Sequence, residues 1–408
     1  MNSSSQQIEP NNKDVEFFRK KRFVLLLGII SMLMPLAVDL YLSAIPAMAK
    51  FFQTTDGHVQ ITLSSYILGF ALGQLIYGPI SDSIGRRPII IYGILSFALI
   101  SIICGFVSSI QQLILLRFFH GFVAASAAVV INALLRDIYE NKEFSRMFSM
   151  VLLVSNIAPL TAPLLGGWIL LWFNWQAIFW VLGTLSVVTL FVSFLYIKET
   201  LKPENKQRFS LRHIRKNFYA IVTNRAVFFF ILTTAFSFAG MFAFITAGSS
   251  VYIGQFGISE AHFGYYFGLN VLCMMLLNIT NTRLVKHVGV FKMFCIGISL
   301  QASMGLLLII AAWLKFPFIY FVFCISGFVG SLAMVNSNAM AMIMDKFPNF
   351  AGTASSLTGT FRFGVAALVG MLLARVHTQS VWPMVLTMSG CAFIAMLFAL
   401  IAIKSVKK

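Results

Sequence analysis

Three ionisable side chains interrupt long apolar stretches of this 408-residue sequence: Asp39, Arg117 and Arg362. An ionisable side chain surrounded by hydrocarbon is costly, so it normally faces a partner or a water-filled cavity. A buried carboxyl can gain or lose a proton as its surroundings change, whereas an arginine stays charged and binds carboxylates or phosphates. The chemistry that these residue types indicate is proton transfer and the recognition of charged groups.

Patterns that mark nucleotide hydrolysis or metal-dependent catalysis are absent from the sequence. It contains no G-x-x-x-x-G-K-[ST] phosphate loop and no H-E-x-x-H or comparable cluster of metal ligands or nucleophiles. The five cysteines fall inside apolar runs without a C-x-x-C spacing, which favours reduced thiols in the core or facing lipid. We therefore expect a protein that is not an enzyme and that needs no cofactor and no metal.

The elements that must hold these residues are long and apolar. Hydrophobic residues make up 59% of the chain and charged residues 11%, against roughly 25% charged residues in soluble proteins. A membrane-crossing helix needs about twenty mainly apolar residues. The sequence offers twelve such stretches, at 23–45, 59–80, 88–108, 112–135, 144–171, 175–197, 226–250, 260–282, 291–313, 317–340, 350–374 and 380–403. The predicted fold class is an all-α membrane protein with twelve transmembrane helices.

The twelve stretches fall into two sets of six around a basic segment. We predict a cytoplasmic N-terminal tail (1–22), an N-terminal six-helix half (23–197), a cytoplasmic linker (198–225), a C-terminal six-helix half (226–403) and a cytoplasmic tail (404–408). The first 22 residues lack the apolar core and cleavage site of a signal peptide, so the first apolar run should remain as a helix.

The net charge of +17 is concentrated on one side of the predicted membrane. Of the 30 basic residues, 25 fall in the tails, the linker and the even-numbered connections, and only Lys50, Lys315 and Arg375 fall on the opposite side. Basic connections stay in the cytoplasm, so both termini are predicted to be cytoplasmic. No basic patch is left over for nucleic acid. The expected partners are the bilayer, protons and a small-molecule substrate, and we expect a monomer.

Asp39 and Arg117 are predicted to lie at the same depth in the membrane. Asp39 comes shortly before the outer end of helix 1, and Arg117 shortly after the outer start of helix 4. At about 1.5 Å per residue, both would lie roughly 8–9 Å below the outer surface. An ion pair, direct or through water, is therefore possible. The pair is interpreted as a proton-coupling site, and a purely structural buried pair is the alternative.

Four segments resemble the signature motifs of one transporter family. Residues 69–82 (GFALGQLIYGPISD) with 85–88 (GRRP) resemble the second helix and following loop of major facilitator transporters. Residues 39–46 (DLYLSAIP) look like the helix 1 signature of the bicyclomycin/chloramphenicol (Bcr/CflA) branch of drug:proton antiporters. Residues 117–121 (RFFHG) and 158–167 (APLTAPLLGG) resemble the helix 4 motif of proton-coupled members and the helix 5 antiporter motif. The resemblance covers the whole chain and implies the major facilitator fold.

The resemblance further implies a cytoplasmic gate at the loop between helices 2 and 3. Its residues are Gly78, Asp82, Gly85, Arg86 and Arg87, with Asp137 at the inner end of helix 4. Asp82 is expected near the start of helix 11, around Phe350, where the positive helix end stabilises an anion. Either Arg86 or Arg87 is expected to pair with Asp137, and a plain basic surface loop is the alternative.

In the helix 5 motif, two prolines and two glycines predict a bent and closely packed helix. Pro159 and Pro163 each remove a backbone hydrogen bond, and Gly166 and Gly167 permit close helix contact. The resemblance implies that this segment limits leakage; packing without a coupling role is the alternative. Ser43 departs from the branch, which usually has proline at that position.

Arg362 falls near the middle of helix 11 and has two interpretations. It is either bonded to backbone carbonyls or extended to the membrane surface, or it is an anchor for an anionic substrate group. The predicted substrate cavity also includes four aromatic residues that would form an adaptable apolar lining. They are Tyr41, Tyr66, Phe238 and Phe242.

The predicted function is proton-coupled efflux of drugs or other small xenobiotics across the bacterial inner membrane, by alternating access of two helical halves. An exporter of a specific endogenous metabolite, for example an anionic siderophore, is the first alternative, and Arg362 favours it. A membrane sensor or enzyme that does not transport is the second.

Overall fold

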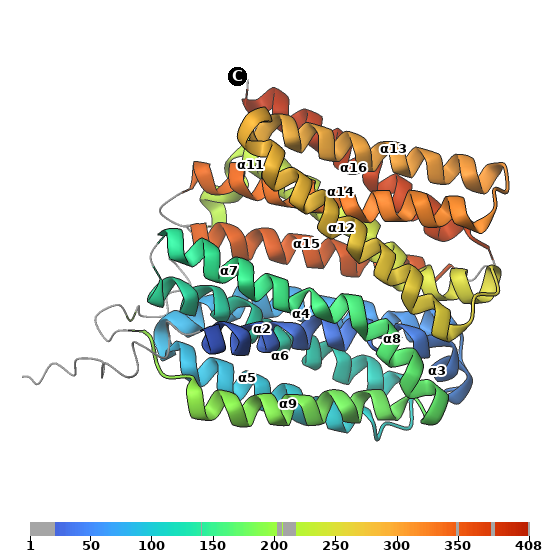
Figure 1. Ribbon diagram of the computed structural model, residues 1–408, viewed down its shortest axis with the longest axis horizontal. Coiled ribbons are helices and arrows are strands. Elements are labelled where there is room, and N and C mark those ends of the chain that lie inside the picture. The colour runs from blue at the N-terminus through green and yellow to red at the C-terminus, as the bar shows by residue number, and fades with distance from the viewer. Residues whose placement is uncertain are drawn as a thin grey trace, which may run out of the picture.

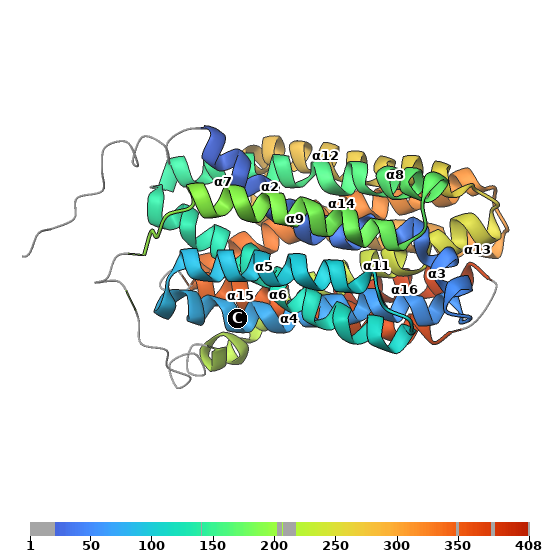
Figure 2. The same ribbon diagram turned by 90° about the horizontal axis from the view of Figure 1, so that it is seen from below.

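The computed structural model describes residues 21–139, 141–201, 206, 218–347, 351–376 and 380–406, and in these ranges its regular structure is entirely helical. The helices run side by side along the long axis of the molecule (Figures 1 and 2). Twelve segments are long and apolar enough to cross a membrane. The N-terminal tail and most of the linker lie outside the described residues.

Nine helices make up the first six spans, because spans 1 and 5 are interrupted. They are α2 (Lys21–Asp39), the 3-10 turn η1 (Leu42–Ala44), α3 (Ile45–Phe51), α4 (Asp56–Ile84), α5 (Arg86–Cys104), α6 (Ile110–Ile138), α7 (Asn141–Ser155), α8 (Ile157–Trp172) and α9 (Gln176–Tyr196). The last six spans are α11 (Arg225–Ser249) with the π-helical turn η3 (Ser250–Gln255), α12 (Glu260–Val288), α13 (Val290–Trp313), α14 (Phe318–Lys346), α15 (Ala351–Ala374) and α16 (Trp382–Val406). The twelve predicted spans are confirmed, with boundaries shifted by a few residues.

Short polar residues set where several helices begin. The side chains of Thr55, Ser109, Asn224 and Ser259 accept a hydrogen bond from the backbone N–H three residues ahead, at the starts of α4, α6, α11 and α12. This cap satisfies one of the donors that a helix start leaves open. Gly85, with φ of +129°, ends α4 and begins α5 directly, a backbone conformation that favours glycine.

Two interruptions follow from the sequence around them. Span 5 breaks at Asn156, three residues before Pro159, whose ring excludes the carbonyl of Ser155 from its helical position. The helix is therefore interrupted next to this proline, while its bend stays a prediction. Span 1 leaves the α-helical conformation after Asp39 and continues through η1 into α3. Asp39 thus lies at the end of a helix and not within one.

The two sets of six helices lie next to each other, blue to green below and yellow to red above in Figure 1. They meet mainly where α4 packs along α15 and where α8 packs against α12. Within the first half, α4 and α6 approach closely because Gly69 faces the backbone of Phe118 and Gly121 faces that of Tyr66. These contacts form the predicted all-α architecture of two six-helix halves.

Candidate functional site

Arg117, in α6, is fully buried and surrounded by aromatic rings. Its guanidinium carbon lies 4.3 Å from the ring centre of Tyr66, 5.0 Å from that of Tyr41 and 5.8 Å from that of Phe179. Its Nη2 donates a 2.8 Å hydrogen bond to the carbonyl of Ala37. Because the last carbonyls of a helix have no partner within it, Arg117 caps the end of α2.

His120 lies one turn further along α6 and holds Arg117 in place. A guanidinium only donates hydrogen bonds, so Nδ1 of His120 accepts the 3.1 Å bond from Nη1 of Arg117. The N–H group of Nε2 then donates a 2.9 Å hydrogen bond to Ser101 Oγ. The Ser101 hydroxyl in turn donates a 2.8 Å hydrogen bond to the carbonyl of Phe97. These bonds fix a neutral imidazole and its ring orientation. Sequence reasoning did not single out His120, although its spacing of three residues from Arg117 was a signal.

Asp39 is 4% exposed and lies at the break in span 1. Within the described part of the chain, its carboxylate makes no hydrogen bond and no ion pair within 4.0 Å. The ion pairs found there join Arg86 to Asp82 and to Asp137. Of the two forms of ion pair considered possible between Asp39 and Arg117, the direct one is therefore not present, and a pair through water stays a prediction. The reason is local: α2 ends just after Ala37, and the carbonyl left open there takes the guanidinium of Arg117.

The helix 5 motif packs against the same break. A side chain at Gly166 would overlap the carbonyl oxygen of Leu40, so only glycine permits this approach. Ser43 Oγ donates a 3.2 Å hydrogen bond to the carbonyl of Pro163, a bond that proline at position 43 would not make. Close helix contact at this motif is thus present, while its effect on leakage stays a prediction.

The predicted cavity residues do not lie together in one place. Tyr41 and Tyr66 are fully buried around Arg117, where the Tyr41 hydroxyl contacts Thr62 and that of Tyr66 donates weakly to the carbonyl of Met34 over 3.4 Å. Phe242 is also buried and packs against Gly370. Phe238 lies instead beside Arg362, with 5.2 Å between its ring centre and the guanidinium carbon. A cavity role for these residues stays a prediction.

The loop between α4 and α5 carries a network of charged side chains. Arg86 Nη1 donates to Asp82 over 2.5 Å and to Ser81 Oγ over 2.8 Å, while its Nε donates to Asp137 over 3.1 Å. Of the two arginines, Arg86 is thus the partner of Asp137. Arg87 Nη2 donates to the carbonyl of Phe194, near the end of α9, over 3.1 Å. The expected contact of Asp82 around Phe350 lies outside the described residues.

Glu199 completes this network, and sequence reasoning missed it. Its carboxylate accepts hydrogen bonds from the backbone N–H groups of Arg86 (2.9 Å) and Arg87 (3.2 Å), the first two of α5. A negative charge at a helix start is stabilised by the open N–H groups and the helix dipole. Thr200 adds a 3.1 Å bond to Asp137. The end of span 6 is therefore tied to the start of span 3 and to the end of span 4.

Glu199→Gln should lower the stability of the protein by about 1 kcal/mol, because the amide keeps the shape but removes the charge that caps α5. The measurement is the thermal melting of detergent-purified protein, with the exposed Glu143→Gln as a matched control. Equal melting temperatures for Glu199→Gln and wild type would show that the cap contributes nothing.

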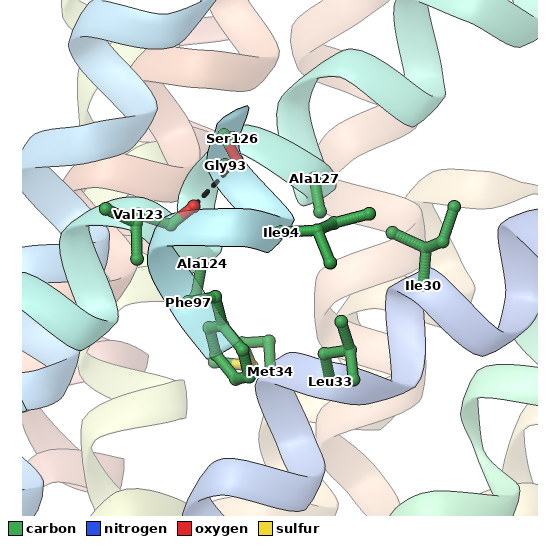
Figure 3. Close-up of a pocket in the computed structure, with 10 residues that line it drawn as sticks. All are labelled: Ile30, Leu33, Met34, Gly93, Ile94, Phe97, Val123, Ala124, Ser126 and Ala127. Carbon is green, nitrogen blue, oxygen red and sulfur yellow. Dashed lines mark hydrogen bonds between the residues drawn. The ribbon is translucent and has the colours of Figure 1, made fainter. Parts of the chain in front are cut away.

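A small void lies between α2, α5 and α6, and Figure 3 shows the side chains that line it. Its volume is about 10 Å³, at the lower limit of what a single water needs. Its lining is mostly apolar, and the hydroxyl of Ser126 donates to the carbonyl of Val123 over 2.7 Å. This void is a packing defect within the first half and is too small for a substrate.

Polar contacts join the two halves at two levels. At the end where α4 begins, the Ser250 hydroxyl accepts from Gln60 Nε2 over 3.1 Å and donates to Asp56 over 2.9 Å. Further along α4, Ser356 of α15 donates to the carbonyl of Gln74 over 2.6 Å and Thr360 donates to that of Ala71 over 3.2 Å. Backbone carbonyls of α4 therefore accept hydrogen bonds that hold α15 of the second half against it.

Twelve spans in two packed halves, with ionisable side chains inside the spans, are typical of a membrane transporter. The model of the Major Facilitator Superfamily matches residues 27–371, and the chain belongs to this family. The chain is 39% identical to a bicyclomycin resistance protein homolog of Haemophilus influenzae, over 92% of this chain and 94% of that protein. The predicted family and Bcr/CflA branch are confirmed, as is a transporter in place of an enzyme.

More distant relatives and solved structures agree with this assignment. The chain is 26% identical to the multidrug resistance protein MdtL of Vibrio parahaemolyticus (83% of this chain, 85% of that one). It is also 26% identical to a chloramphenicol resistance protein of Pseudomonas aeruginosa (89% and 86%). A mutant form of the nucleoside transporter NupG superposes with a TM-score of 0.75 at 12% identity, covering 94% of this chain and 99% of that one. The structural match shows the fold alone.

Proposed function

We propose that this protein exports drugs and other small xenobiotics across the bacterial inner membrane in exchange for protons. The two halves rock about the contacts described above and expose a central site to each side in turn. Both termini lie in the cytoplasm, as the distribution of basic residues indicates. The resistance names of the relatives support the substrate class.

The observation that carries this proposal is the position of Asp39. It is a buried carboxyl without an ionic or hydrogen-bonding partner among the described residues, at a helix break that contacts the helix 5 motif. A carboxyl in such a place is a proton carrier, because its charge is tolerated only when water or a partner reaches it. A change in the packing of spans 1 and 5 therefore changes its protonation.

A proton gradient supplies enough free energy for this exchange. One charge moving through 100 mV yields about 2.3 kcal/mol, and one pH unit yields about 1.36 kcal/mol. For one proton per substrate, the two together sustain roughly a 500-fold substrate gradient.

The test is transport by purified protein in proteoliposomes. We expect radiolabelled chloramphenicol or bicyclomycin to accumulate against its gradient when a pH difference is imposed, with a matching movement of protons. Collapse of the gradient with nigericin and valinomycin should abolish accumulation. Uphill accumulation that survives this collapse would contradict proton coupling, and no movement of substrate or protons would favour a protein that does not transport.

A second candidate is the export of an anionic metabolite, and Arg362 is the observation that favours it. Export of neutral drugs requires no charge on the substrate, whereas an arginine inside the membrane favours a substrate with a negative charge. The experiment in the next subsection separates the two.

A further inference from the structure

We propose that Arg362, with the rings of Phe238, Phe363 and Phe70, forms a binding subsite for the acidic group of an organic anion with an aromatic or apolar body. The proposal rests on the proposed function, since it names a substrate class for the same transporter. The group recognised is a carboxylate, or a phosphonate or sulfonate of similar shape.

The first argument is that the guanidinium of Arg362 has no polar partner among the described residues. Within the described part of the chain, Arg362 makes no hydrogen bond and no ion pair, and its buried Nε has no partner. The Nε of Arg117 is likewise without a partner, but its Nη1 and Nη2 bond to His120 and to the carbonyl of Ala37. Of the two intramembrane arginines, one already has polar partners and the other has its donors unused.

The second argument is the position of Arg362 in the fold. It lies in the middle of α15, twelfth of the 24 residues of that helix, so its charge is far from either end of the span. Two other residues of α15 lie on the side of the helix that packs against α4: Gly359 is next to Gln74, and Phe363 contacts Phe70. Arg362 is offset from this face by about 60–100° around the helix, which brings it to Phe238 of α11. The subsite therefore joins residues from both halves.

The third argument is the chemistry of its walls. The guanidinium carbon lies 4.7 Å from the ring centre of Phe363 and 5.2 Å from that of Phe238. The ring centres of Phe363 and Phe70 lie 4.8 Å apart. Aromatic faces hold a cation and orient its plane, but they accept none of its five N–H bonds. A carboxylate matches the planar fork of an arginine with two parallel hydrogen bonds, and the partly exposed ring of Phe238 provides contact area for an apolar body, with Phe363 and Phe70 packed behind the guanidinium.

A matched pair of probes tests this directly: 1-naphthoate and its neutral amide, 1-naphthamide, binding to purified full-length protein in detergent. We expect wild-type protein to bind the carboxylate about tenfold more tightly than the amide, as for a hydrogen bond to a charged group. Arg362→Gln should weaken naphthoate about tenfold and leave naphthamide within about twofold. Arg362→Lys should restore part of the loss, because it keeps the charge and loses the fork.

The control variant is Arg375→Gln, which removes an exposed charge just beyond the end of α15 and should leave both probes unchanged. Equal weakening of both probes by Arg362→Gln would overturn the proposal and make Arg362 structural, as would the absence of naphthoate binding to wild type. If Arg362→Gln does not fold, naphthoate binding by Arg362→Lys equal to wild type would also overturn it. Proton-driven chloramphenicol export is measured separately, so loss of the subsite proposal leaves the transport proposal standing.

Discussion

Asp39→Asn is expected to reduce proton-driven uphill export to background while neutral substrates still bind within about twofold of wild type. The asparagine keeps the size of the side chain and its place at the end of α2, but it carries no exchangeable charge at pH 7. Without a proton carrier, the halves can still bind and release substrate, yet the gradient no longer drives the cycle. Downhill exchange of substrate should therefore persist.

The measurement compares uphill accumulation with counterflow in the same proteoliposomes. Glu143→Gln serves as the control, because it removes a carboxylate from an exposed position at the start of α7 and should behave as wild type. Full pH-driven accumulation by Asp39→Asn would end the hypothesis that this carboxyl couples transport. Loss of counterflow as well would point to a structural role for Asp39.

Gly121→Val is expected to destabilise the protein by about 3 kcal/mol, the upper end of what overpacking a core costs. A side chain at position 121 would overlap the carbonyl oxygen of Tyr66, a backbone atom that has no rotamer to change. The helices α4 and α6 must then separate, and the surroundings of Arg117 on α6 are disturbed with them. We expect the melting temperature in detergent to fall by about 5 °C or more.

Gly390→Ala provides the comparison for this variant. An added Cβ at Gly390 meets nothing within 4 Å, and alanine favours a helix over glycine. It should therefore melt at or slightly above the wild-type temperature. A Gly121→Val protein that melts with wild type would show that α4 and α6 are not held at this distance.

The sequence predicts the spans well because length and hydrophobicity decide whether a helix crosses a membrane. Pro159 likewise predicts the interruption of span 5, since the missing N–H is a local property, whereas Pro163 lies within the continuous helix α8. The partner of Arg117 was not predictable in the same way. Taking 23–45 as one helix placed Asp39 within it, whereas the chain leaves the helix at Asp39 and offers the carbonyl of Ala37 instead.

Long-range pairings account for the other differences. Glu199 appeared to belong to a basic linker, and nothing in its neighbours indicates that it caps a helix more than 110 residues earlier. The aromatic residues were expected to line one cavity, but Tyr41 and Tyr66 lie around Arg117 and Phe238 lies beside Arg362, because their helices belong to different halves. The choice of Arg86 over Arg87 as the partner of Asp137 also depends on which way each side chain leaves the start of α5.

The hydroxyl of Ser250 has a consequence for how the two access states are populated. It bridges Gln60 and Asp56 across the halves at the predicted outer end. Two such hydrogen bonds contribute about 1–3 kcal/mol in total, since each is worth about 0.5–1.5 kcal/mol net. Under the proposed cycle, their loss alone shifts the ratio of outward-closed to outward-open molecules by only about 5- to 150-fold. These two hydrogen bonds are thus too weak to keep the outer side closed by themselves, and the packing of α8 against α12 must contribute to the closure.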